Sequence, residues 1–187
     1  MSSGRPMRVH VHQAPGPFTE QVLALLGTLP VDRMADARLA ELSIAPLLTR
    51  RLTEAEWNAP IYGTLIFHPS LLPRHRGPDA VRWTVAAGDR FTGVTWFWCA
   101  AGLDTGDICE QELVAVPPGI SAGRLYHAHL IPAGLRSLAR AIEAMRAGYP
   151  RHVQQDETAA TYEPRWPDTT PRNGGDPLKE PEGAQTG

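Results

Sequence analysis

Two kinds of apolar segment alternate along this chain, and their alternation constrains the fold more than any other feature. Residues 64–68 and 93–99 are short runs rich in β-branched and aromatic side chains, and each run is too short for a helix. Residues 18–29 carry valine and leucine at helical spacing, and residues 121–147 form a longer helical stretch that Pro132 interrupts. Short strands that alternate with helices are typical of an α/β fold with an open sheet.

Shorter elements are expected nearer the N-terminus. Residues 8–12 alternate apolar and polar side chains, which indicates a strand. Residues 36–42 are expected to form a second short helix, and residues 42–48 a buried strand that ends in a loop. Residues 53–57 begin with a threonine and two nearby glutamates, which is the signature of a capped helix start.

The length and composition indicate one globular domain followed by a tail. The chain has 187 residues, 42% of them hydrophobic and 20% charged, which is enough to build one core. We assign residues 1–166 to the domain. Residues 167–187 are rich in proline, glycine, threonine and charge, and we expect them to be disordered.

Charge and cysteine usage exclude several classes of function. The net charge of −2 gives no broad basic surface, so no nucleic-acid partner is expected. No apolar run approaches the roughly 20 residues that span a bilayer, and no secretory leader is visible, so we expect no membrane association. Cys99 and Cys109 have no metal-ligand or redox spacing, which is compatible with a reducing cytoplasm, and no metal site is predicted.

Two polar residues lie where an open sheet places its ligand crevice. His68 ends the strand predicted at residues 64–68, and Asp104 lies in a glycine-flanked loop after the strand at 93–99. A carboxylate that approaches an imidazole fixes its orientation and stabilises its charged form, which suits acid–base catalysis. Taken alone, a histidine at a strand end is more often a hydrogen-bonded structural residue.

The surrounding motifs carry a resemblance to a known family. His-Pro-Ser-Leu-Leu-Pro at residues 68–73, followed by Arg76-Gly77, and Gly-Leu-Asp-Thr-Gly-Asp at residues 102–107 resemble the formyltransferase family that uses 10-formyltetrahydrofolate. The nearest branch is the hydrolase domain of the 10-formyltetrahydrofolate dehydrogenases, and the N-terminal domain of methionyl-tRNA formyltransferase is also similar. The resemblance implies a Rossmann-like open sheet with flanking helices, with 10-formyltetrahydrofolate as co-substrate.

The resemblance also implies roles for particular residues. His68 would be the general acid and base and would donate a hydrogen bond to the developing oxyanion. Asp104 would orient His68 and pass protons. For His75, in the same loop as the first motif, we expect a surface imidazole, with ligand contact as the alternative.

Two further segments would hold the pteridine ring. The backbone of Arg50, Arg51 and Leu52 matches the family stretch that does so, and the loop from Ala101 to Asp104 would close over the same ring. The alternative for the two arginines is a solvated basic turn.

The chain departs from the family pattern in two places. Formyltransferases usually have an asparagine two residues before the catalytic histidine, where this chain has Ile66. Losing one oxyanion donor typically costs about 10²–10³ in rate. The hydrolase domain of the 10-formyltetrahydrofolate dehydrogenases also has isoleucine at this position, so the resemblance to that branch implies water or a carrier thiol as acceptor rather than an amine. Only 67 residues precede His68, fewer than the family usually has, so we expect a fold shortened at its N-terminus.

Two functions therefore remain open. The first is an enzyme that transfers or hydrolyses the formyl group of 10-formyltetrahydrofolate, with water, an amine, a sugar or a carrier thiol as acceptor. The second is a non-catalytic folate-binding or interaction module derived from such an enzyme. Ile66 and the short N-terminal part favour the module, whereas the intact pair of His68 and Asp104 favours the enzyme.

Overall fold

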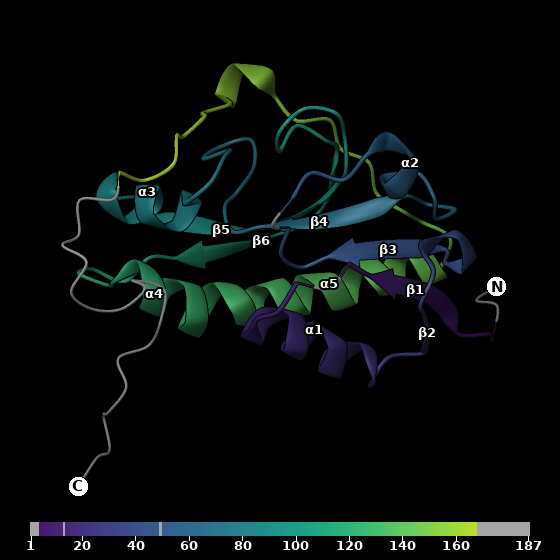
Figure 1. The fold of residues 1–187 in the computed structure, drawn as a ribbon. Helices are drawn as coiled ribbons and strands as arrows, with labels where there is room; N and C mark the ends of the chain where they lie inside the picture. Colours follow the sequence, from purple (N-terminus) through teal and green to yellow (C-terminus); the bar gives the residue numbers. More distant parts are fainter. Residues whose placement is uncertain (1–3, 13, 49, 168–187) are drawn as a thin grey trace, which may run out of the picture.

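The computed structural model describes residues 4–12, 14–48 and 50–167, so the predicted tail lies outside the described residues from residue 168 onward. Within the described part, six strands form a sheet in the order β2-β1-β3-β4-β5-β6 (Figure 1). The strands are β1 (Met7–Val11), β2 (Val31–Met34), β3 (Leu42–Ala45), β4 (Thr64–His68), β5 (Phe91–Trp98) and β6 (Ile108–Ala115).

The sheet has a parallel part and an antiparallel part. β1 pairs in parallel with β2 and β3, and β3 pairs in parallel with β4. β5 then runs antiparallel to both β4 and β6. The open α/β sheet predicted from the alternation of segments is therefore confirmed. Because parallel strands end at the same edge, the carboxyl ends of β3 and β4 lie together, where such sheets hold their ligands.

The N-terminal region corrects one prediction. The short helix expected at residues 36–42 is only a 3-10 turn, η1 (Ala37–Leu39), and β3 already begins at Leu42. The preceding edge strand, Val31–Met34, was not predicted. Its central residues are charged and exposed, and an edge strand buries too little apolar surface to leave a clear pattern.

The helices lie on both sides of the sheet (Figure 1). α1 and α5 cover one side, and they also contact each other. α2, α3 and the loops that follow β4 and β5 lie on the other side. The helices are α1 (Pro17–Leu26), α2 (Glu54–Trp57), α3 (Ala80–Ala86), α4 (Ala122–Leu125) and α5 (Ile131–Arg146), with a 3-10 turn η3 (Glu157–Ala159).

The predicted helical stretch at residues 121–147 contains a π turn, η2 (Tyr126–Leu130), between α4 and α5. The N–H of Ile131 donates to the carbonyl of Tyr126, five residues earlier. Pro132 follows at once, and its ring has no N–H and crowds the preceding turn. The wider turn accommodates the proline and lets a regular helix continue as α5.

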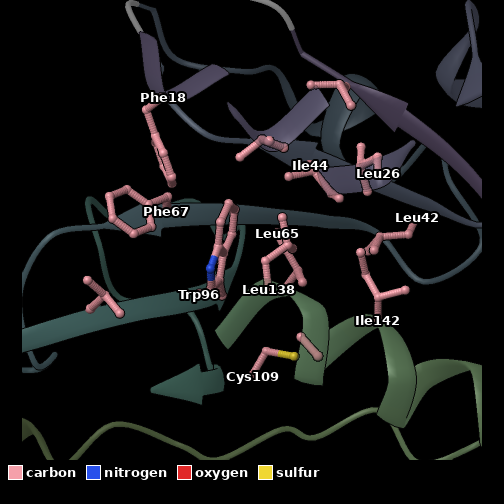
Figure 2. Packing of buried hydrophobic residues seen from close by; sticks show 14 of the residues in the cluster. Phe18, Leu26, Leu42, Ile44, Leu65, Phe67, Trp96, Cys109, Leu138 and Ile142 are labelled. Carbon is pink, nitrogen blue, oxygen red and sulfur yellow. The ribbon is translucent and has the colours of Figure 1, made fainter. Parts of the chain in front are cut away.

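Aromatic and aliphatic side chains from the sheet, α1 and α5 form the main core (Figure 2). The rings of Phe18 and Phe67 lie 4.5 Å apart, and those of Phe67 and Trp96 lie 5.3 Å apart. A Cβ at Gly134 of α5 would lie 2.7 Å from the Phe67 ring, so this helix approaches the sheet only because the position is glycine. The Trp96 indole N–H also donates to the Gly134 carbonyl at 2.9 Å.

Candidate active site

A cavity of about 830 Å³ lies beyond the carboxyl ends of β3 and β4. Residues predicted from the two sequence motifs and from the arginine segment all line it. These are Arg50, Arg51, Leu52, His68, Ala101 and Asp104. Its volume falls in the range of pockets that enclose cofactor-sized molecules, roughly 300–1,000 Å³. Distant parts of the chain are thus brought to one concave site.

The side chains of His68 and Asp104 face each other at the wall of this cavity. His68 Nδ1 lies 3.7 Å from Asp104 Oδ2, which is longer than a hydrogen bond but close enough for a strong charge interaction. His68 Nε2 lies 2.7 Å from the His75 carbonyl oxygen. A carbonyl only accepts, so Nε2 carries the hydrogen and the lone pair of the neutral ring is on Nδ1.

The local backbone holds Asp104 in place. Asp104 has a φ of +54°, in the left-handed region that non-glycine residues seldom adopt. The N–H of Gly77 donates to its Oδ2 at 2.7 Å, and the Gln155 amide donates to its carbonyl at 2.9 Å. One contact holds the side chain and the other holds the backbone of Asp104, and together they stabilise an otherwise unfavourable conformation.

Burial sets the protonation of His68. Its side chain is only 8% exposed, and this desolvation lowers the pKa of His68 below its usual value of 6.5. The Asp104 carboxylate and the hydrogen bond to His75 oppose that shift without reversing it. At neutral pH the ring is therefore uncharged, and its free Nδ1 can accept a proton.

In the segment from Arg50 to Leu52, the Arg50 side-chain charge is paired with Glu56 and solvated, which leaves the backbone as the main source of polar groups. The Arg50 guanidinium is largely exposed and pairs with Glu56 at 3.0 Å, which agrees with a solvated turn for this side chain. In the described part of the chain, the backbone N–H groups of Arg51 and Leu52 have no hydrogen-bond partner. A capping box between Thr53 and Glu56 fixes the start of α2 directly after them.

His75 is not the surface imidazole that was expected. Its side chain is 6% exposed, does not line the cavity, and lies between Asp89 and Glu163. No role could be assigned to Asp89, Glu163 or Gln155 beforehand, because nothing in the sequence shows which distant side chains meet His75 and Asp104. Glu163 does lie in a segment, Ala160-Thr161-Tyr162-Glu163, that resembles the family. Unlike His75, Ile66 and Tyr126 line the cavity.

Three other observations concern metal binding, membrane spans and the Cys99 thiol in the described residues. No group of three or more histidine, cysteine, aspartate or glutamate side chains in this part is arranged to hold a metal ion. None of its helices has the length and apolar character needed to cross a membrane. The Cys99 thiol lines the cavity, and burial raises its pKa to about 11, so it is protonated at neutral pH.

Comparison with known proteins extends the resemblance seen in the motifs. Residues 29–141 match the model of the formyl transferase family. The cytosolic 10-formyltetrahydrofolate dehydrogenase of Pongo abelii is 40% identical over 124 residues, which cover 66% of this chain and 14% of that protein. The methionyl-tRNA formyltransferase of Moorella thermoacetica is 36% identical over 133 residues, which cover 70% of this chain and 42% of that enzyme.

A solved structure shares the fold. HypX from Aquifex aeolicus, in complex with tetrahydrofolic acid, superposes with a TM-score of 0.74 at 20% identity, over 86% of this chain and 30% of that one. This chain therefore spans only a part of the dehydrogenase and HypX proteins that it matches. The family model covers more than half of the chain and includes both His68 and Asp104. The chain belongs to the formyl transferase family.

Proposed function

We propose that this chain transfers or hydrolyses the formyl group of 10-formyltetrahydrofolate, with His68 and Asp104 as its acid–base pair. The observation that carries the proposal is their meeting, from segments far apart in the sequence, at the wall of a cavity of about 830 Å³. The dehydrogenase relatives are named for this folate, and HypX was crystallised with tetrahydrofolic acid, which supports the choice of donor.

The cavity suits a flat heterocycle with amide-like edges. Leu52, Ile66 and Phe97 provide apolar walls, and the backbone N–H groups of Arg51 and Leu52, for which the described residues supply no partner, are the donors we assign to the ring. The loop that contains Ala101 borders the same space. A few backbone groups within apolar walls are the usual way to orient such a ring, so we assign the pteridine to these residues.

The reaction follows from the state of His68. Because Nε2 already donates to His75, Nδ1 takes the proton of the acceptor, water or an amine, as its oxygen or nitrogen attacks the formyl carbon. Asp104 stabilises the imidazolium that forms. Nδ1–H can then donate to the tetrahedral oxyanion and pass its proton to N10 as the carbon–nitrogen bond breaks. Tetrahydrofolate leaves with formate or with a formylated acceptor.

Ile66 bears on the choice of acceptor. It lies two residues before His68 on β4, so both side chains point to the same face of the sheet and both line the cavity. An isoleucine gives no hydrogen bond to an oxyanion, so the protonated Nδ1 of His68 would have to do this alone. Because Ile66 matches the isoleucine of the hydrolase branch, we favour hydrolysis, with a sugar, another amine or a carrier thiol as the other acceptor classes.

The first prediction tests the proposal directly. Asp104→Ala should lower the rate of tetrahydrofolate formation from 10-formyltetrahydrofolate by about 10²–10⁴, because the imidazolium loses its counter-charge. Absorbance spectroscopy of the purified chain measures this rate, with water alone and with an amine panel. Asp107→Ala is the matched control, because this carboxylate lies three residues away, is 43% exposed and does not line the cavity.

The outcomes separate the two candidate functions. An active wild type and Asp107→Ala with an inactive Asp104→Ala support the enzyme. Folate binding without turnover by any acceptor would instead identify a non-catalytic module. Equal rates for both variants would remove Asp104 from the mechanism.

A further inference from the structure

The C-terminal segment of the described chain is fastened to the loop that follows His68. We call residues 155–166 the strap. Its backbone bonds to the loop at both ends of His75: the N–H of Thr161 donates to the Pro73 carbonyl at 3.2 Å, and the N–H of Arg76 donates to the Thr161 carbonyl at 3.0 Å. Figure 1 shows the strap, in yellow-green, passing over the loops beside β4 and β5 toward α3. It lies outside the residues that match the family model.

A buried charge cluster adds to this backbone contact. His75 Nε2 lies 2.8 Å from Asp89 Oδ2, and His75 Nδ1 lies 3.1 Å from Glu163 Oε1 of the strap. Both ring nitrogens of His75 therefore lie within hydrogen-bond distance of a carboxyl group, one on each side of the ring. Although burial opposes it, hydrogen bonds from His75 and Arg74 lower the pKa of Asp89, which keeps this carboxylate charged.

The backbone at this cluster touches both residues of the proposed acid–base pair. The His75 carbonyl accepts from His68 Nε2 at 2.7 Å, and two residues later the Gly77 N–H donates to Asp104 at 2.7 Å. His75 itself has a φ of +55°, which is unfavourable for a residue with a Cβ. The contacts of the His75 side chain with the two carboxyl groups therefore add to the hydrogen bonds with Thr161 in holding this backbone in position.

We propose that His75 is a positioning residue and that the strap, through Glu163, is part of the active site. The Glu163–His75–Asp89 arrangement fixes the carbonyl that holds His68 and the N–H that holds Asp104. The kinetic consequence rests on the proposed function, whereas the effect on the His68 ring does not. Loss of Glu163 would leave a buried imidazole N–H without an acceptor and release the loop.

The second prediction tests this with Glu163→Ala. In the wild type, nuclear magnetic resonance should detect a slowly exchanging His68 Nε2–H, assigned by its loss in His68→Gln. In Glu163→Ala this signal should broaden through exchange with water. Turnover should fall about tenfold while KM for 10-formyltetrahydrofolate changes by less than about twofold, because the folate-holding residues are untouched.

A matched control variant separates positioning from general loosening. Glu112 is as buried as Glu163, with side chains 19% and 21% exposed, and is also paired with basic residues, but it is not a cavity-lining residue. Glu112→Ala should leave the His68 signal and turnover unchanged. If Glu163→Ala does not fold, Glu163→Leu takes its place, because it keeps much of the volume and supplies no acceptor for the His75 ring.

The result that would overturn the inference is a His68 signal in the Glu163 variant identical to that in Glu112→Ala. If the wild type turns over no folate, the proposed function alone fails, and the His68 signal still decides the role of the strap. A His68 signal that broadens equally in both variants would mean general loosening and would also reject the proposal.

Discussion

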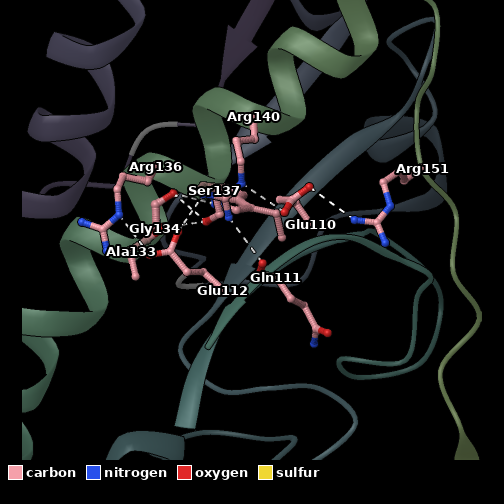
Figure 3. Close-up of polar contacts among 10 residues, drawn as sticks. Glu110, Gln111, Glu112, Ala133, Gly134, Arg136, Ser137, Arg140 and Arg151 are labelled. Carbon is pink, nitrogen blue, oxygen red and sulfur yellow. Dashed lines mark hydrogen bonds and ion pairs between the residues drawn. The ribbon is translucent and has the colours of Figure 1, made fainter. Parts of the chain in front are cut away.

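Two clusters of acids and bases in this molecule have carboxylates of similar burial, with 13–21% of each side chain exposed, but their basic side chains differ in their contact with water. On the outside of the sheet, Glu110 and Glu112 of β6 pair with arginines at positions 136, 140 and 151 (Figure 3), whose side chains are 45–60% exposed. Under the strap, the His75 imidazole between Asp89 and Glu163 is 6% exposed. Similar pairings thus occur in two very different environments.

This difference shows which ion pairs can hold neighbouring groups in one position. Exposed pairs are screened by water and contribute about 0–1 kcal/mol each, so their side chains can rearrange at little cost. When one partner of a buried pair is removed, an uncompensated charge remains, which costs about 3–5 kcal/mol. Only the buried cluster can therefore hold a backbone carbonyl in one position beside His68.

The largest expected effect breaks the buried cluster at its other carboxylate. Asp89→Ala should lower the free energy of unfolding by about 2–3 kcal/mol, because it leaves one nitrogen of the buried His75 ring without its hydrogen-bond partner. Glu110→Ala in the exposed cluster should cost about 1 kcal/mol or less. Urea unfolding measures both, and equal losses would show that burial does not separate the clusters.

The next effect concerns the glycine between the strap and Asp104. Gly77 has a φ of +98°, and an added Cβ would lie 2.3 Å from the Glu163 carbonyl oxygen. Gly77→Ala should destabilise the fold by about 2–3 kcal/mol, because backbone strain and displacement of the strap add together. Gly88→Ala, with φ of +67° and no atom within 4 Å of its Cβ, should cost only the strain, about 1–2 kcal/mol.

Thermal or urea unfolding of the two alanine variants gives the comparison. If Gly77→Ala is no less stable than Gly88→Ala, the strap moves away from residue 77 at little cost in free energy, and the contact between Gly77 and Glu163 is not rigid.

The smallest expected effect is that His68 and Glu112 alter the stability of the fold in different ranges of pH. Burial lowers the pKa of His68 below 6.5, so the unfolded state binds more protons as the pH falls through 6.5, and the native state loses stability there. For Glu112, burial acts in the opposite direction, but hydrogen bonds from Arg136 and Arg140 lower its pKa below 4.5. Its contribution is present above 4.5 and is lost as the pH falls further.

Urea unfolding between pH 8 and pH 3 checks these two windows. The stability of the wild type relative to His68→Gln should decrease between pH 7 and pH 5. The stability of the wild type relative to Glu112→Gln should decrease only below pH 4.5. A difference from His68→Gln that stays constant across the whole range would contradict a buried neutral imidazole.

The sequence predicts the site where local rules apply. The strand that ends at His68 was predicted correctly, but β5 runs antiparallel to it and ends beside Leu65, so Asp104 reaches His68 only through the loop that follows β5. The family motifs, rather than the strand ends, are what indicated that the two residues act together. The β2 strand was missed because its exposed charges hide the apolar pattern. The burial of His75 could not be predicted, because it depends on Glu163, 88 positions away, and on how the strap crosses the loop.

The π turn at Tyr126–Leu130 joins α4 to α5 and changes which face of the helical segment each part presents to its surroundings. An inserted residue rotates everything before it by about 100° relative to a regular helix. Tyr126 therefore borders the cavity, while Leu138 and Ile142 of the same helical segment are buried against the sheet. In a regular α-helix, Tyr126 could not line the cavity while Leu138 and Ile142 remain packed against the sheet.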